Sequence, residues 1–173
     1  MKIFQAMKRL IAITIILLSI ASCTFVNVSR TLNDVESYIM ERPDSALAVL
    51  ESIDRVDLNT ARTKAHHALL HAMALDKNFI DVSDDSIAQV AVDYFSKHSP
   101  QKYHARSLYY LGLAYYYQED YNKAIVEFTK AEEIALECDS LYLGMSKIKK
   151  ADSYSKTYND IEALKMLEEA TFI

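Results

Sequence analysis

Turn-forming residues are scarce in this chain of 173 residues, which has two Gly and two Pro and no Asn-Gly or Gly-Gly pair. An all-β or α/β domain of this length needs many tight turns, and these are the residues that form them. Ala, Leu, Glu, Lys and Tyr are abundant instead, and most of them favour helices. The composition therefore predicts an all-α fold.

The same scarcity removes several kinds of catalytic or cofactor site. Gly112 and Gly144 are isolated and fall inside predicted helices, so neither a P-loop nor a dinucleotide-binding loop can form around them. The chain contains no Gly-x-Ser-x-Gly segment and no evident Cys/His pairing for nucleophilic catalysis. We therefore expect a protein that is not an enzyme and that binds no cofactor.

Metal-binding patterns are incomplete. His67 and His71 are one helical turn apart and His66 precedes them, but no Glu stands at the spacing that a helical zinc site requires. The acidic segment 81–85 lacks the central Gly of a calcium-binding loop, and it suits the start of a helix better. The sequence thus predicts no metal site.

The N-terminus has the pattern of a secretory signal. Lys2, Lys8 and Arg9 provide positive charge, and an apolar run follows over residues 10–20. The next step, Ile20 to Cys23, fits the bacterial lipobox, in which small side chains enter the peptidase and the thiol accepts a diacylglyceryl group. An uncleaved anchor is the alternative, but eleven apolar residues fall short of the ~20 that span a bilayer.

This pattern predicts a signal peptide over residues 1–22, lipidation at Cys23 and a polar tether over residues 23–30. Once Cys23 is acylated, Cys138 cannot form an internal disulfide. From Cys23 onward the chain has 16 basic and 24 acidic residues, a net charge of −8. Such an acidic chain is not drawn to nucleic acid or to anionic headgroups, so we expect membrane contact through the lipid alone.

Eight helices are expected between residues 31 and 173, because cap residues and prolines recur between apolar stripes. The start signals are Thr31, Pro43, Asn59 or Thr60, the acidic segment 81–85, Ser99-Pro100, Tyr121, Asp139 and Asn159. The joints between these helices are short, which favours antiparallel pairs.

One pair carries the spacing of the tetratricopeptide (TPR) repeat, strongest over residues 105–138. The matching positions are Leu108, Leu111, Gly112, Tyr115, Ala124, Phe128 and Ala131. A second register lies 39 residues later, although Lys147 and Lys150 replace large apolar residues there. We expect Gly112 and Ala124 to face one another at the closest approach of the two helices, with Tyr115 and Phe128 filling the space beside them.

On these residues the chain resembles the TPR lipoproteins of Gram-negative cell envelopes, and in particular the N-terminal part of larger members that continue into more repeats. The resemblance spans residues 31–173. It implies a TPR-like, right-handed helical-hairpin solenoid of about four helix pairs, anchored by lipid in a cell envelope. We expect a periplasmic domain and favour the outer membrane, and the inner membrane stays open as the alternative. Solenoid ends normally have a polar outer face. We therefore expect either a truncated family member or a last helix that docks onto something else.

In the register of that family, one face of the first helix of a repeat lines a concave surface for a protein or peptide partner. The corresponding residues here are Arg106, Tyr109, Leu113, Tyr116 and Tyr117. Tyr and Arg are enriched at interface hot spots. The alternative is that these tyrosines only pack between repeats. Two other functions stay open: the periplasmic sensor part of a signalling protein, and an accessory lipoprotein of an outer-membrane assembly or uptake complex.

Overall fold

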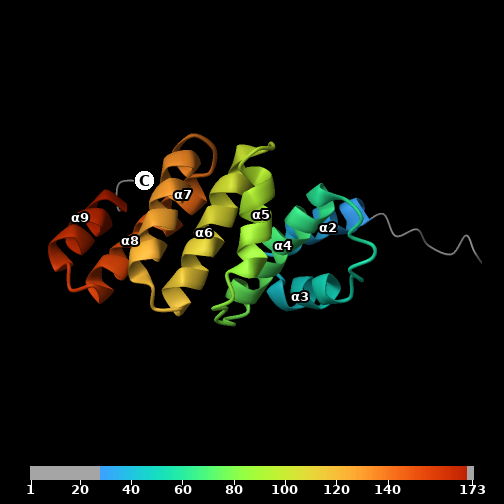
Figure 1. Cartoon of the computed structure of the whole chain (residues 1–173), viewed down its shortest axis with the longest axis horizontal. Helices are drawn as coiled ribbons and strands as arrows, with labels where there is room; N and C mark the ends of the chain where they lie inside the picture. The colour runs from blue at the N-terminus through green and yellow to red at the C-terminus, as the bar shows by residue number, and fades with distance from the viewer. Residues whose placement is uncertain (1–27, 171–173) are drawn as a thin grey trace, which may run out of the picture.

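The computed structural model describes residues 28–170 (Figure 1). This part of the chain contains eight α-helices and no strand, which confirms the all-α prediction. The helices are α2 (Val28–Tyr38), α3 (Pro43–Glu51), α4 (Ala61–Lys77), α5 (Ser86–Phe95), α6 (Gln101–Tyr117), α7 (Tyr121–Cys138), α8 (Ser140–Lys156) and α9 (Asp160–Ala170).

Local cap residues or a first-turn proline account for four of the eight described helix starts. Pro43 is the first residue of α3, where a missing N–H costs nothing. Thr60 and Thr63 form a reciprocal cap before α4, with N–H···O distances of 3.1 and 3.2 Å. The carboxylates of Asp120 and Asp139 accept bonds from the first turns of α7 and α8. These starts agree with the sequence-based expectation.

Two starts differ from it. Thr31 lies inside α2, which is already helical at Val28, so residues 28–30 belong to the folded part and not to the tether. The buried side chain of Val28 explains this, because it extends the apolar stripe of α2 by one turn. Pro100 is itself the cap of α6, which begins at Gln101. The predicted signal peptide and Cys23 lie outside the described residues.

The helices lie in chain order along the long axis of the molecule (Figure 1). Each helix packs against the next, and α2, α4, α6 and α8 also contact one another in sequence. Among the described helices, no two odd-numbered ones are in contact. The even-numbered helices therefore form one continuous side of the molecule, which we call the even-helix face.

The turns that follow α4, α6 and α8 have the same construction. In each, one residue adopts a left-handed conformation, with φ near 60°. The next N–H in the chain then bonds to a carbonyl five residues back, at 2.9–3.0 Å, which closes the helix end. The left-handed residues are Phe79, Glu119 and Tyr158. These three residues are almost evenly spaced along the chain, so the same backbone turn recurs after helix pairs of nearly constant length.

The repeat signature packs much as the spacing predicted. Five of the signature residues are buried, namely Leu108 and Leu111 of α6 and Ala124, Phe128 and Ala131 of α7. The close contact of Gly112 is different from the expected one. A Cβ there would lie 2.7 Å from the ring of Phe128, so the aromatic ring, and not Ala124, fills the space that the glycine leaves. Tyr115 is only half-buried.

Candidate interaction site on the even-helix face

Glu36 of α2 is the centre of a polar cluster on the even-helix face. Its Oε2 atom accepts a hydrogen bond from the Tyr103 hydroxyl of α6 and lies 3.2 Å from Nε2 of His66 in α4. Its Oε1 atom is 3.4 Å from Nη1 of Arg106 and 3.6 Å from Nζ of Lys102. One carboxylate thus joins three helices that are distant in sequence.

These contacts determine the protonation of the cluster. Burial alone would raise the pKa of Glu36, but hydrogen bonds from His66 and Tyr103 and the charge of Lys102 outweigh it and lower the pKa to about 2. Burial and the bond to Glu36 raise the pKa of Tyr103, which keeps its hydroxyl protonated and able to donate. With four donors around it and so low a pKa, Glu36 is a poor general base.

Arg106 extends the cluster to the fourth even-numbered helix. Its Nε atom lies 2.7 Å from Oδ2 of Asp139, whose other oxygen accepts the N–H of Tyr142 and caps α8. The guanidinium also stands over the Tyr142 ring, 5.1 Å from its centre. The cluster of Glu36, His66, Lys102, Tyr103, Arg106 and Asp139 therefore connects α2, α4, α6 and α8. We call it the Glu36 cluster.

A cavity of about 310 Å³ adjoins the Glu36 cluster and is lined by residues of α2, α4, α5 and α6. His66 and Tyr103 of the cluster line it, and Leu32 and Phe95 add apolar lining. Asn33 and Arg62 are exposed at its edge. Within residues 28–170, Arg62 forms no ion pair, so its guanidinium is available to an incoming acceptor group.

The structure places the five predicted groove residues of α6 differently from one another. Tyr109 and Leu113 are buried, with 2% and 3% of their surface exposed, so they do not present a surface to a partner. The reason is that Tyr142 of α8 covers Tyr109, with ring centres 5.4 Å apart. For these two residues the predicted role is wrong. Arg106 is on the even-helix face, but its charge is already paired.

Tyr115, Tyr116 and Tyr117 end α6, and each lies near a carboxylate of a neighbouring segment. The Tyr116 hydroxyl donates to Asp152 of α8 at 2.7 Å. Burial and the Asp81 carboxylate raise the pKa of Tyr117 to about 12. Burial and the charge of Asp85, at the start of α5, raise the pKa of Tyr115. The three side chains are half-buried, and Tyr116 is tied to α8, which favours the packing role for these tyrosines.

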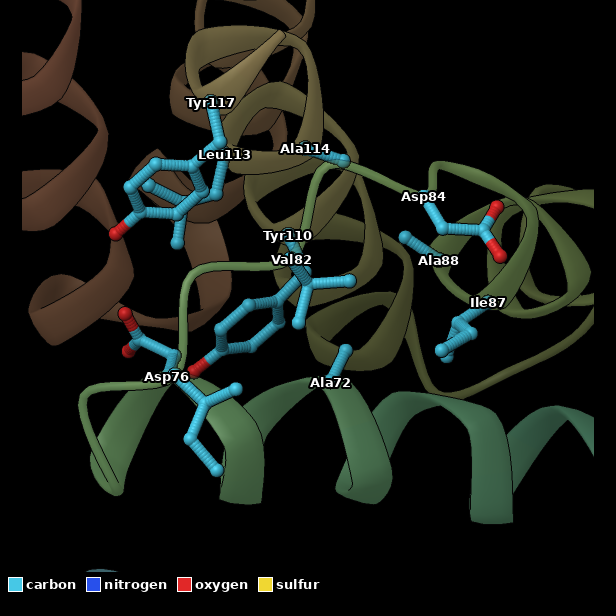
Figure 2. A pocket seen from close by; sticks show the side chains of 11 residues that line it. Ala72, Asp76, Val82, Asp84, Ile87, Ala88, Tyr110, Leu113, Ala114 and Tyr117 are labelled. Atoms are coloured by element: carbon cyan, nitrogen blue, oxygen red, sulfur yellow. The ribbon is translucent and has the colours of Figure 1, made fainter.

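A second recess lies where Leu113 and Tyr117 meet α4 and the connection that follows it (Figure 2). Figure 2 shows the mainly apolar lining, with Asp76 and Asp84 at its sides. The cavity volume is only about 20 Å³, enough for about one water molecule. This recess is therefore a small gap between packed helices and has no room for a ligand.

Other predicted features have structural roles. His67 reaches the carbonyl of Leu50 at the end of α3, with Nε2 at 3.0 Å. Across the described part of the chain, no three His, Cys, Asp or Glu side chains are grouped so that they could hold a metal ion. None of the helices from α2 to α9 is both long and apolar enough to cross a membrane.

Sequence reasoning missed Glu36 and Tyr103, and it considered His66 only as a metal ligand and not as a partner of Glu36. Glu36 is the one acidic residue on the buried side of the α2 stripe, between Val35 and Ile39, and this position was the available signal. Its partners are 30, 67 and 70 residues away, so no local pattern connects them.

Comparisons with protein families, with curated proteins and with solved structures find no match to this chain.

Proposed function

We propose that this chain is a TPR-like, lipid-anchored repeat protein that binds a protein or peptide partner without catalysing a reaction. Four antiparallel pairs, α2–α3 to α8–α9, follow one another with alike turns after α4, α6 and α8. Contacts between even-numbered helices, without contacts between odd-numbered ones, are what a curved solenoid requires. This arrangement supports the resemblance that the α6–α7 spacing suggests.

The observation that carries the proposal is the cavity beside the Glu36 cluster. The cluster fixes the relative positions of α2, α4, α6 and α8, so the face is preorganised for binding. The positive charges of Lys102 and Arg106 are paired with the carboxylates of Glu36 and Asp139. Arg62 and the Asn33 amide therefore remain as hydrogen-bond donors at the edge of the cavity. We infer a partner segment that offers acceptors, such as backbone carbonyls or a carboxylate.

Crosslinking from the edge of this cavity tests the proposal. A photoreactive residue at Arg62 should capture a defined partner in cells, whereas the same residue at the exposed Lys130, on α7, should not. With the captured protein purified, Arg62→Glu should weaken its binding about tenfold or more. Circular dichroism should show an unchanged melting temperature. Equal capture from Lys130, or unchanged affinity of Arg62→Glu, would show that the binding face is elsewhere.

The lipid anchor is a separate part of the proposal and has its own experiment. We propose that Cys23 carries the lipid in a bacterial envelope, in the outer membrane, with the helices in the periplasm. Labelled palmitate should enter the wild-type chain and should not enter Cys23→Ala. Cys138→Ala is the matched control and should be labelled like the wild type. Equal labelling of Cys23→Ala would reject the anchor without affecting the proposed binding face.

A further inference from the structure

The helical part of the chain begins three residues closer to the proposed lipid anchor than the sequence predicted. α2 is helical from Val28, which is the fifth residue after Cys23. Five residues reach at most about 18 Å when they are fully extended. α4 and α6 have 17 residues each, so both helices are about 25 Å long. The connection to the lipid is therefore shorter than these helices.

The starts of α2, α4 and α6 lie together at one edge of the molecule, because Ser29, Arg62 and Tyr103 line the same cavity. In Figure 1 the α5–α6 connection is at the top of the row, and the connections after α4 and α6 are at the bottom. The side with the starts is called the anchor edge and consists of residues 28–31, 48–64 and 92–104. The side with the ends is called the opposite edge and consists of residues 38–46, 74–89 and 114–124.

The length of the connection decides which of the two edges can rest on a membrane. If the opposite edge lay on the surface, the start of α2 would stand about 25 Å away from it. The segment between Cys23 and Val28 reaches only about 18 Å, so a lipid on Cys23 could not remain in the bilayer. The anchor edge is under no such restriction, since α2 starts there.

The two edges also differ in charge. The opposite edge has eight acidic and three basic residues, whereas the anchor edge has four acidic and six basic ones, of which Lys102 pairs with Glu36. The edges are farther apart than the Debye length of about 8 Å, so a membrane responds to the nearer edge and not to the net charge of the chain. Anionic headgroups therefore repel the opposite edge and attract the outer cations of the anchor edge.

Helix stability does not explain the basic residues of the anchor edge. The first turns of α2, α4 and α6 contain no acidic residue, although the helix dipole favours acidic residues there and disfavours cations. Their basic residues are Arg30, Arg62, Lys64 and Lys102. In the connection that leads to α4, Val56 is 83% exposed beside Arg55. An exposed aliphatic side chain next to a cation is suited to the headgroup region of a bilayer.

We propose that the anchor edge lies against an anionic phospholipid surface, so that the lipid and this edge together hold the chain in one orientation. The inference rests on the lipid anchor proposed above, and it adds contact by side chains to the expected contact through the lipid. α4 and α6 then point away from the membrane, with the opposite edge in solution. The inference does not depend on the cavity proposed for a protein partner.

Fluorescence quenching on vesicles tests this orientation. The lipidated full chain, in a Cys138→Ser background, is labelled at Val56→Cys and bound to vesicles of phosphatidylcholine and phosphatidylglycerol with a quencher on the headgroups. Labels at Glu119→Cys, on the opposite edge, and at Val126→Cys, on α7, are the comparisons. We expect the Val56 label to be quenched at least about threefold more than either of them. Equal quenching at the three positions, or stronger quenching at Glu119→Cys, would overturn the proposal.

Charge reversal separates attraction from mere proximity. Arg55→Glu combined with Lys97→Glu should reduce quenching of the Val56 label about threefold or more, and so should high salt or vesicles of phosphatidylcholine alone. Arg42→Glu combined with Lys156→Glu is the matched control, because it changes the net charge equally and leaves the anchor edge intact. It should be quenched like the parent, and all variants should keep their helical circular dichroism. No effect of the first pair or of salt would reject attraction to the lipid surface.

Palmitate labelling distinguishes failure of this inference from failure of the anchor. A chain that does not incorporate palmitate at Cys23 would reject the anchor, and the orientation with it. A chain that is labelled and held on the vesicles, but is quenched equally at both edges, would reject the orientation alone.

Discussion

Gly112 is the position where one added methyl group has the least room. An ideal Cβ there lies 2.7 Å from two ring atoms of Phe128, and that ring is fully buried among packed side chains, so any shift disturbs its neighbours. Overpacking of this kind costs about 1–3 kcal/mol, against roughly 1 kcal/mol that Ala gains over Gly in a helix. We expect Gly112→Ala to lower the free energy of unfolding by up to about 2 kcal/mol in urea titrations.

Gly144 provides the matched control, because it lies in α8 with no neighbouring atom within 4 Å of its added Cβ. Gly144→Ala should therefore raise the free energy of unfolding by about 0.5–1 kcal/mol. Opposite signs for the two substitutions would support the close contact with Phe128. The same sign for both would mean that α6 and α7 are farther apart than described here.

Glu36 links stability to pH. Its folded pKa of about 2 is below the ordinary value of 4.5. Its ionised form is therefore favoured by folding, and this contribution is complete above about pH 5 and is lost as the pH falls toward 2. Glu36→Gln should reduce the free energy of unfolding by about 1–3 kcal/mol near neutral pH, since it weakens bonds to charged donors.

The difference between wild type and Glu36→Gln should shrink as the pH is lowered from about 7 to about 3. Urea titrations at several pH values measure it. The exposed Glu133→Gln, on α7, is the control and should show little difference from the wild type at any pH. A Glu36→Gln effect that is constant with pH would mean that the carboxylate is not held in its ionised form.

The connections after α4, α6 and α8 are the elements whose construction repeats most closely. Each uses a left-handed residue that is not glycine. This conformation costs about 1–2 kcal/mol for a residue with a Cβ. A glycine avoids this cost but loses more chain entropy on folding, which costs about 0.5–1 kcal/mol. Glu119→Gly should therefore raise the free energy of unfolding by about 0.5–1 kcal/mol. Thermal denaturation followed by circular dichroism measures the change.

Glu133→Gly tests the same residue change inside a helix. Glu133 is exposed in the middle of α7, so its replacement should lower the free energy of unfolding by about 1 kcal/mol. If Glu119→Gly were destabilising as well, the turn after α6 would not have the left-handed geometry on which the repeat of the three connections rests.

Helix boundaries were predictable where the interaction that makes them is local. Pro43, Thr60 and Asp139 act within three residues of themselves, so their cap roles can be read from neighbouring letters. The packing of α6 on α7 was predictable for a related reason, because its residues lie within one helix pair. The ring contact of Gly112 with Phe128 required the relative rotation of the two helices, which spacing does not define.

Contacts between pairs were not predictable, because they depend on which helices become neighbours. Glu36 and Arg106 are 70 residues apart, and nothing near either one indicates the other. The weak second register has a similar explanation. Lys150, which replaces an apolar residue there, is buried and hydrogen-bonded to Glu132 of α7. A buried charge pair across two helices thus occupies a position where the repeat pattern calls for packing.

The whole molecule is held by contacts between neighbours along the row, with no contact between its two ends among the described helices. In such an architecture, stability is highest in the middle and lowest at a free end. The pair α6–α7 is packed on both sides, whereas α9 contacts only α8. The order of local opening should follow this order of packing.

Amide hydrogen exchange, followed by mass spectrometry, measures that order. At protein concentrations low enough to keep the chain monomeric, we expect amides of α9 to exchange at least about tenfold faster than those of α6 and α7, because opening α9 breaks one helix contact and exposes little apolar surface. Equal protection of α9 and α6 in the dilute monomer would contradict the neighbour-only packing, because some further contact would then have to hold the end of the row.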